Sequence, residues 1–126
     1  MSHKIAIVIL SDPKTNSEES LGRLFNGLAT AFECKKEGDD VSIVFQGAGT
    51  RWPELISEPD HPAHGLFKAV SDKIAGASCG CAALFEATAG VESCGMPLLT
   101  DNAIDGTPGI ASIRNLVVAG NTVLTF

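Results

Sequence analysis

The stretch from Lys4 to Leu10, KIAIVIL, lies near the start of the chain, and every residue after Lys4 is apolar. It is rich in β-branched residues and shows no alternation of apolar and polar positions. That pattern is typical of a strand buried on both faces. Such strands belong to parallel sheets that helices cover on both sides, so the stretch predicts a parallel α/β fold.

Strand and helix signals then alternate along the chain. A long amphipathic helix follows, opened by a capping box at Thr15–Glu18, and its apolar face contains Leu21, Leu24, Phe25, Leu28, Ala29 and Phe32. The next strand is Val41–Phe45, and later strands are expected to end near Cys79, at Leu99 and at Phe126. Among the helices expected between them are one at 82–89 and a last one that Thr107-Pro108 caps. This order predicts a three-layer α/β sandwich with a mainly parallel sheet and right-handed crossovers.

Composition excludes several classes of function. The 126 residues suffice for one hydrophobic core, so we expect a single domain, 1–126. A net charge of −6 without a basic patch argues against nucleic acid as a partner. The apolar runs are too short for a membrane span, and the start lacks the pattern of a signal peptide. We therefore expect a cytoplasmic protein whose four cysteines are reduced.

The balance of residue types also bears on assembly. Hydrophobic residues make up 44% of the chain and charged residues only 19%. For a single domain this is an apolar composition, and part of the apolar surface is expected to cover an interface between subunits. The composition therefore predicts a homo-oligomer.

Polar and glycine-rich segments follow the predicted strand ends. They are Ser11-Asp12, Gly47–Arg51, Cys79–Cys81 and Thr100-Asp101. In open α/β sheets, ligands bind beyond the carboxyl ends of the strands. We therefore expect these segments to form a site that holds thiols, carboxylates, a guanidinium and free backbone N–H groups.

Cys79 and Cys81 are the candidate catalytic residues. The sequence Cys79-Gly80-Cys81 places Cys81 at the turn from a strand into a helix. Amides without intrahelical partners and the positive end of the helix dipole favour a thiolate there. A thiolate suits sulfur transfer or thiol–disulfide exchange. The alternative is that both residues are small, inert, partly buried apolar side chains.

Other polar residues are candidates for substrate binding. The segment containing Gly47, Gly49, Thr50 and Arg51 could cradle an anion, although a plain tight turn explains it equally well. Asp12, directly after the first predicted strand, is a further candidate for substrate binding. His61 and His64 at a predicted helix start could act as a base for a thiol. Their alternative role is that of helix-cap or surface residues.

Metal and cofactor chemistry is not expected. Cys79, Cys81 and Cys94 with His61 or His64 could form a zinc ligand set, but the paired knuckle spacing of structural zinc sites is absent. The chain also lacks the phosphate-binding motifs of nucleotide-binding proteins, so we expect no cofactor and no metal. Cys34, placed opposite the apolar face of the first helix, and Cys94 are interpreted as unreactive thiols.

Several segments together resemble the DsrE/DsrF-like family, and within it a bacterial subgroup of small proteins. They are the buried first strand, Phe45–Trp52 (FQGAGTRW), Pro59–His64 (PDHPAH), Cys81 followed by Ala82, and Thr122–Phe126 (TVLTF). The resemblance covers essentially the whole chain. It implies a five-stranded α/β sandwich that assembles into trimers or hexamers.

The resemblance also implies a reaction. Sulfur-relay members of the family carry a persulfide on a cysteine after the third strand, and Cys81 matches that position. The subgroup spaces two cysteines as C-x-x-C-A, whereas this chain has Cys79-Gly80-Cys81-Ala82. The resulting hypothesis is a persulfide carrier that exchanges sulfur with a donor or acceptor protein, with Cys79 as the resolving or second carrier thiol. The alternatives are a non-catalytic module that binds an anion or small molecule, and a structural or regulatory subunit of an oligomer.

Overall fold

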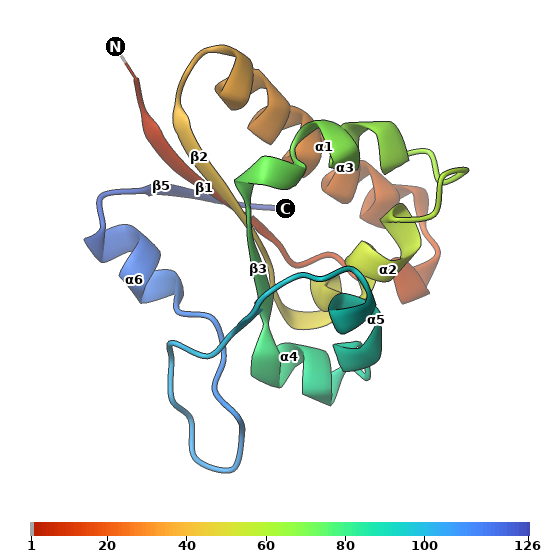
Figure 1. The fold of residues 1–126 in the computed structure, drawn as a ribbon, viewed down its shortest axis with the longest axis vertical. Helices are drawn as coiled ribbons and strands as arrows, with labels where there is room; N and C mark the ends of the chain where they lie inside the picture. Colours follow the sequence, from red (N-terminus) through yellow and green to blue (C-terminus); the bar gives the residue numbers. More distant parts are fainter. Residues whose placement is uncertain (1) are drawn as a thin grey trace.

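The computed structural model describes residues 2–126 and contains a five-stranded sheet in the order β4-β3-β2-β1-β5 (Figure 1). The strands are β1 (Lys4–Ile9), β2 (Asp40–Phe45), β3 (Ile74–Ser78), β4 (Leu98–Leu99) and β5 (Thr122–Thr125). The helices are α1 (Glu18–Lys36), α2 (Trp52–Ile56), α3 (His64–Ala69), α4 (Cys79–Leu84), α5 (Thr88–Ser93) and α6 (Ile113–Val118). Short 3-10 turns are η1 (Pro13–Thr15), η2 (Gly47–Arg51) and η3 (Ser71–Lys73).

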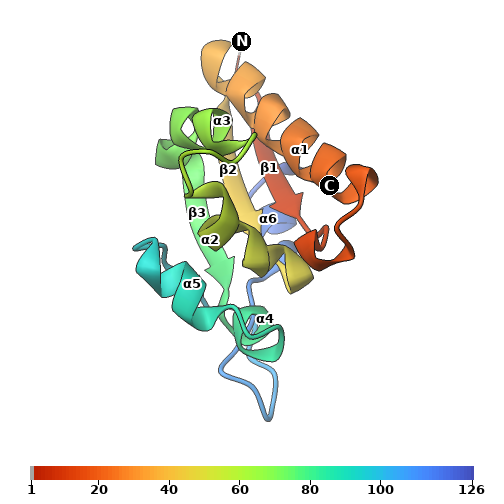
Figure 2. The same cartoon turned by 90° about the vertical axis from the view of Figure 1, so that its right-hand side faces the viewer.

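All strand pairs are parallel, and helices lie on both faces of the sheet. Figures 1 and 2 show α1, α2, α3 and α5 on one side and α6 on the other. The strands from β1 to β4 advance in one direction, so their crossovers share one face, whereas the return from β4 to β5 crosses the other. This arrangement confirms the predicted α/β sandwich.

The alternate residues of β1 explain why the strand is apolar throughout. Ile7 and Ile9 face α1 and pack with Leu24 and Leu28 in the main core cluster. Ala6 and Val8 point to the opposite face and are also fully buried. Every residue from Ala6 to Ile9 loses its contact with water, so an alternating pattern there would have left a polar group inside the protein.

The second face of the sheet is covered by α6 and by the chain that leads into it. Ala111 donates its N–H to Ser78 Oγ at 3.0 Å, and its carbonyl accepts from Gln46 Nε2 at 3.2 Å. Ser78 ends β3, Gln46 directly follows the neighbouring strand β2, and both are buried. These bonds fix the return segment against the carboxyl ends of β2 and β3. Within residues 2–126, no helix combines the length and the apolar character required to cross a membrane.

Three helix boundaries differ from those that the sequence suggests. α1 is capped by Ser17, whose side chain accepts from the N–H of Ser20, because Thr15 belongs to the preceding turn η1. The expected helix at 82–89 breaks at Glu86, which has a φ of 56°, and continues as α5. The last helix starts after Ser112 and not at Pro108.

Candidate functional site

The carboxyl ends of β1, β2 and β3 meet around Arg51. Its Nη1 lies 3.0 and 3.1 Å from the two carboxylate oxygens of Asp12, which follows β1. Its Nε donates to the carbonyl of Phe85 at 3.1 Å, and its guanidinium carbon lies 5.2 Å from the centre of the Phe85 ring. Arg51 therefore links the turn after β1 to the end of α4, the helix that follows β3.

Asp12 is held in its charged form by its neighbours. Partial burial raises the pKa of this carboxyl, but the N–H of Lys14 and the hydrogen bonds and charge of Arg51 outweigh burial, so the pKa lies below its ordinary value. The side chains of Arg51 and Asp12 are 20% and 29% exposed, so water screens the pair only in part. The charge of Arg51 is thus matched inside the protein.

The Gly47–Arg51 segment is a packed turn. A Cβ on Gly49 would lie 2.2 Å from the carbonyl oxygen of Ile9, so only glycine fits there. Gly47 has a φ of 58°, and its carbonyl accepts from the Thr50 hydroxyl at 2.8 Å. Thr50 is 1% exposed. These contacts give Gly47, Gly49 and Thr50 a structural role, in line with the tight-turn interpretation.

Cys79 and Cys81 both lie in the first turn of α4, directly after β3, and both thiols are free and half-buried. Each residue of an α-helix is rotated by about 100° from the one before it, so two side chains that are two residues apart point to nearly opposite sides of the helix. Cys81 shares its side of the helix with Phe85, four residues later, whereas Cys79 does not. The geometry therefore does not bring the two thiols together.

The start of α4 is covered on one side by the return segment. Gly80 donates its N–H to the carbonyl of Gly109 at 2.7 Å. A Cβ on Gly80 would lie 2.8 Å from a methyl carbon of Ile110, so Gly80 permits this close approach. The N–H of Gly80, one of the free amides expected to stabilise a Cys81 thiolate, is therefore already hydrogen-bonded.

The two histidines belong to a different part of the structure. The His61 ring meets Trp52 edge to face at 6.2 Å between centres, and its Nδ1 accepts from the N–H of Ala63. His64 Nδ1 lies 2.8 Å from the carbonyl oxygen of Ile56 and donates to it. All these partners lie in α2 or in the segment that leads into α3. The structure does not place either imidazole beside a thiol of α4.

The remaining cysteines differ from each other. Cys34 is 7% exposed and packs in the main core, which corrects the expectation that it lies opposite the apolar face of its helix. Burial, then the charges of Asp39 and Glu33, raise the pKa of the Cys34 thiol. Cys94 is half-buried at the end of α5. Within residues 2–126, no three His, Cys, Asp or Glu side chains group in a way that could hold a metal ion.

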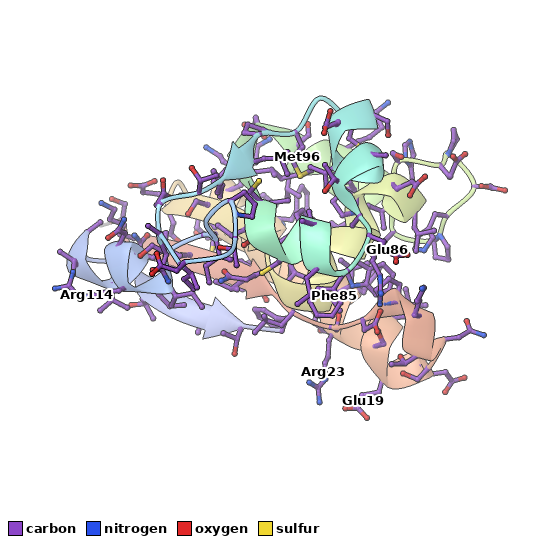
Figure 3. All side chains as sticks on the ribbon, turned by 90° about the horizontal axis from the view of Figure 1, so that it is seen from below. Glu19, Arg23, Phe85, Glu86, Met96 and Arg114 are labelled. Carbon is purple, nitrogen blue, oxygen red and sulfur yellow. The ribbon has the colours of Figure 1, made fainter. Side chains whose placement is uncertain are left out.

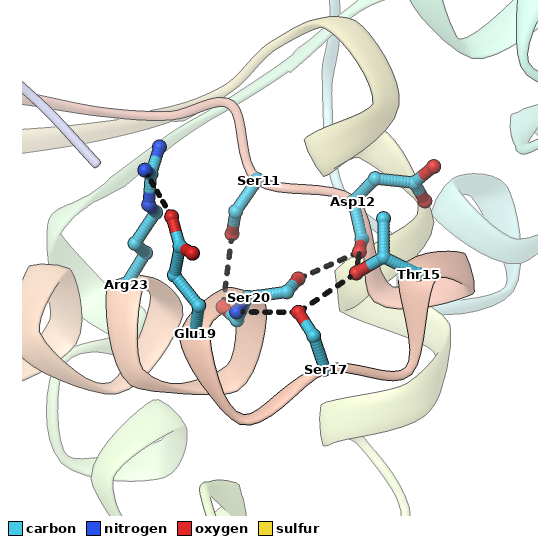
Figure 4. A pocket seen from close by; sticks show the side chains of 7 residues that line it. All are labelled: Ser11, Asp12, Thr15, Ser17, Glu19, Ser20 and Arg23. Carbon is cyan, nitrogen blue, oxygen red and sulfur yellow. Dashed lines mark hydrogen bonds and ion pairs between the residues drawn. The ribbon is translucent and has the colours of Figure 1, made fainter.

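A pocket of about 240 Å³ lies at the turn after β1 (Figure 4). Its hydroxyls are bonded to each other and to the backbone: Ser20 donates to the carbonyl of Asp12 at 2.6 Å, and Thr15 lies 3.1 Å from Ser17. Glu19 pairs with Arg23 at its rim. The Asp12 carboxylate points away from these hydroxyls in Figure 4. The pocket is therefore built from a turn whose polar groups are already satisfied.

The sequence analysis missed Phe85, although its spacing of four residues from Cys81 in one helix is a usable signal. It also missed Trp52, whose indole N–H donates to the carbonyl of Ser11 at 2.8 Å. No signal in the sequence marks Glu86, which lies next to Phe85 at the end of α4 (Figure 3). Phe85 contacts the guanidinium of Arg51, Trp52 follows Arg51 in the chain, and Glu86 lines the same pocket as Arg51.

The arrangement thus offers one half-buried thiol on the side of α4 that Arg51 contacts, and a second thiol on the other side. A free thiol in this position can act as a nucleophile toward a substrate that reaches the carboxyl edge of the sheet. Comparison of the chain with known protein families, with curated proteins and with solved structures finds no match.

Proposed function

We propose that the protein is a thiol-based carrier that accepts and donates sulfane sulfur at Cys81. The observation that carries the proposal is the position of this free, half-buried thiol, at the third residue of α4 and beyond the carboxyl end of β3. Ligands of open α/β sheets bind at that edge. The resemblance to sulfur-relay proteins of the DsrE/DsrF-like family supports the same residue.

The reaction conserves electrons and needs no cofactor. The Cys81 thiolate attacks the outer sulfur of a donor persulfide, a bond forms between the two sulfurs, and the donor's sulfur–sulfur bond breaks. The donor leaves as a thiolate, and Cys81 holds the transferred sulfur as a persulfide. An acceptor thiolate then attacks that outer sulfur and restores the Cys81 thiolate.

Arg51 supports this role through the helix that carries Cys81. Cys81 and Phe85 lie on one side of α4, and Arg51 stacks on the Phe85 ring and bonds its carbonyl. Because Asp12 fixes the guanidinium from the other side, the end of α4 is held against the turn after β1. Arg51 is thus a positioning residue, and Cys79 is not assigned as a resolving thiol.

Mass spectrometry tests the proposal. The wild-type protein, incubated with a small-molecule persulfide donor and then blocked with an alkylating reagent, is expected to gain the mass of one sulfur atom on the peptide that contains Cys81. Cys81→Ser should abolish the adduct, and Cys79→Ser, the matched control two residues away, should retain it. An adduct that persists unchanged in Cys81→Ser would contradict the proposal.

We propose further that the carrier works in the cytoplasm as a homo-oligomer. A reducing compartment keeps all four thiols free, as the carrier requires. The support for assembly is the exposed apolar surface: Leu84 on α4 is 75% exposed, and Val118 on α6 is 66% exposed. A trimer or hexamer that covers these side chains would bury apolar area that a monomer leaves in water.

A further inference from the structure

A second concave site lies between η1, α2 and the junction of α4 with α5. Its volume is about 250 Å³. Its apolar part is formed by Pro13, Leu55 and Phe85, and Leu55 is 42% exposed. Large exposed apolar side chains next to charged groups are typical of small-molecule sites, because the apolar wall holds the ligand and the charges orient it.

Two cations line this pocket. Arg51 is held in place by Asp12 and Phe85 through Nη1 and Nε, and its Nη2 makes no hydrogen bond within the described residues. Lys14 also lines the pocket, and its Nζ has no partner there among residues 2–126. The fixed guanidinium leaves N–H donors available for a carboxylate, at little further cost in side-chain entropy.

Two carboxylates line the same pocket from other elements. Glu54 of α2 packs against Gly90 of α5. A Cβ added to Gly90 would lie 2.6 Å from Oε2 of Glu54 and 2.9 Å from Cβ of Glu54. Gly90 therefore leaves the space that Glu54 occupies. Glu86 sits at the bend between α4 and α5, and Figure 3 shows it beside Phe85. Neither carboxylate makes a salt bridge with a described residue.

We propose that this pocket binds a small zwitterion, a free α-amino acid with an aliphatic side chain. The ligand's carboxylate pairs with Lys14 and with Nη2 of Arg51, and its ammonium pairs with Glu54 and Glu86. The aliphatic side chain covers Phe85 and Leu55. Asp12 already balances the charge of Arg51, so the lining charges without a salt bridge among residues 2–126 are those of Lys14, Glu54 and Glu86. A ligand with only one charge would meet at least one of these with like sign, so the mixed lining favours a zwitterion.

This proposal does not depend on the chemistry of Cys81. None of the residues that it uses carries a thiol, and Cys81 does not line the pocket. A protein without any sulfur-carrier activity would still bind the amino acid, and a sulfur carrier without this binding site would still form the persulfide. The two proposals therefore fail separately.

Saturation-transfer NMR, which observes the ligand and suits weak binding, tests the inference. Leucine is compared with 4-methylpentanoate, which lacks the ammonium, and with 3-methylbutylamine, which lacks the carboxylate. We expect leucine to bind with a millimolar Kd and each analogue to bind about tenfold more weakly, the effect of one lost charge-assisted contact. Absence of leucine binding, or equal binding of all three compounds, overturns the proposal.

Variants localise the binding. Glu54→Gln and Glu86→Gln are each expected to weaken leucine binding severalfold and to leave the weak binding of 4-methylpentanoate unchanged or improved. Glu37→Gln, at the far end of α1, is the matched control and should bind like the wild type. Thermal unfolding confirms that each variant is folded. Leucine binding that is the same in all three folded variants would overturn the assignment.

Discussion

Arg51 is the residue at which three strand ends are joined. It follows β2, its carboxylate partner Asp12 follows β1, and Phe85 ends the helix that follows β3. The planar guanidinium uses Nη1 for both carboxylate oxygens of Asp12 and Nε for the carbonyl of Phe85, so one rigid group fixes the relative positions of these segments. Arg51 therefore holds the end of α4, the helix that carries Cys81, against the turn after β1.

Replacement of Asp12 by Asn removes the charged partner of Arg51. We expect a loss of roughly 1–3 kcal/mol in the free energy of unfolding near neutral pH, because hydrogen bonds to charged groups contribute about that much. The pKa of Asp12 is lowered from 3.8 in the folded protein, so the contribution is complete above that value and is lost as the pH falls through the lower, folded pKa.

Urea unfolding of the wild type and of Asp12→Asn between neutral and acidic pH measures this difference. The stability gap between the two proteins should close in acid. A gap that stays constant down to the lowest pH at which the proteins fold would show that the carboxylate charge contributes nothing.

Cys34 has the opposite dependence on pH. Burial raises the pKa of this thiol, so the folded protein resists its ionisation. Stability is fully present below the ordinary thiol pKa and is lost as the pH rises through the folded value. Cys34→Ala should therefore flatten the decline of stability in mild alkali, as measured by urea unfolding, even if the variant is less stable at neutral pH. An unchanged alkaline decline would contradict this.

Among the elements, η2 depends on a close approach that only glycine allows. Gly49→Ala would place a Cβ 2.2 Å from the backbone of β1, where no flexible side chain can yield. We expect a loss of about 1–3 kcal/mol or more in the free energy of unfolding. Gly22→Ala in α1 is the matched control, because nothing lies within 4 Å of its Cβ and alanine favours a helix by about 1 kcal/mol. Equal effects of the two substitutions in urea unfolding would refute the packing argument.

The class of the fold could be predicted from local patterns, but the order of the strands could not. The apolar run of β1 predicts a strand with two covered faces, and the structure confirms it. Pairing between strands depends on contacts far apart in the chain, for which a single sequence has no local signal. Helix starts were misplaced where several capping residues compete, as in the segment that contains both Thr15 and Ser17.

The candidate site was predictable in part for the same reason. The rule that ligands meet strand ends selected Asp12 and Arg51, and the structure joins them. His61 and His64 were selected for their place at a predicted helix start, but these residues bond within their own segment, so no geometry connects them with a thiol. Glu54 and Glu86, the carboxylates of the proposed amino-acid pocket, lie in α2 and at the bend between α4 and α5. Neither follows a strand, so the rule about strand ends could not predict them.

For the whole molecule, the exposed apolar residues of α6 predict self-association. Val117 is 56% exposed and Val118 is 66% exposed, next to the edge strand β5. We expect analytical ultracentrifugation to find a trimer or hexamer for the wild type and smaller species for the double variant Val117→Ser/Val118→Ser. Asn115→Ser on the same helix is the control and should sediment like the wild type. A wild-type protein that sediments only as a monomer would contradict the proposal.

The proposed chemistry depends on an accessible and reactive thiol at position 81, which pH-dependent alkylation with peptide mapping measures. Cys81 is expected to react fastest of the four cysteines near neutral pH, and Cys34, buried in the core, is expected to react slowest. Alkylation of Cys81 no faster than that of Cys34 would contradict the account and leave the fold without its proposed chemistry.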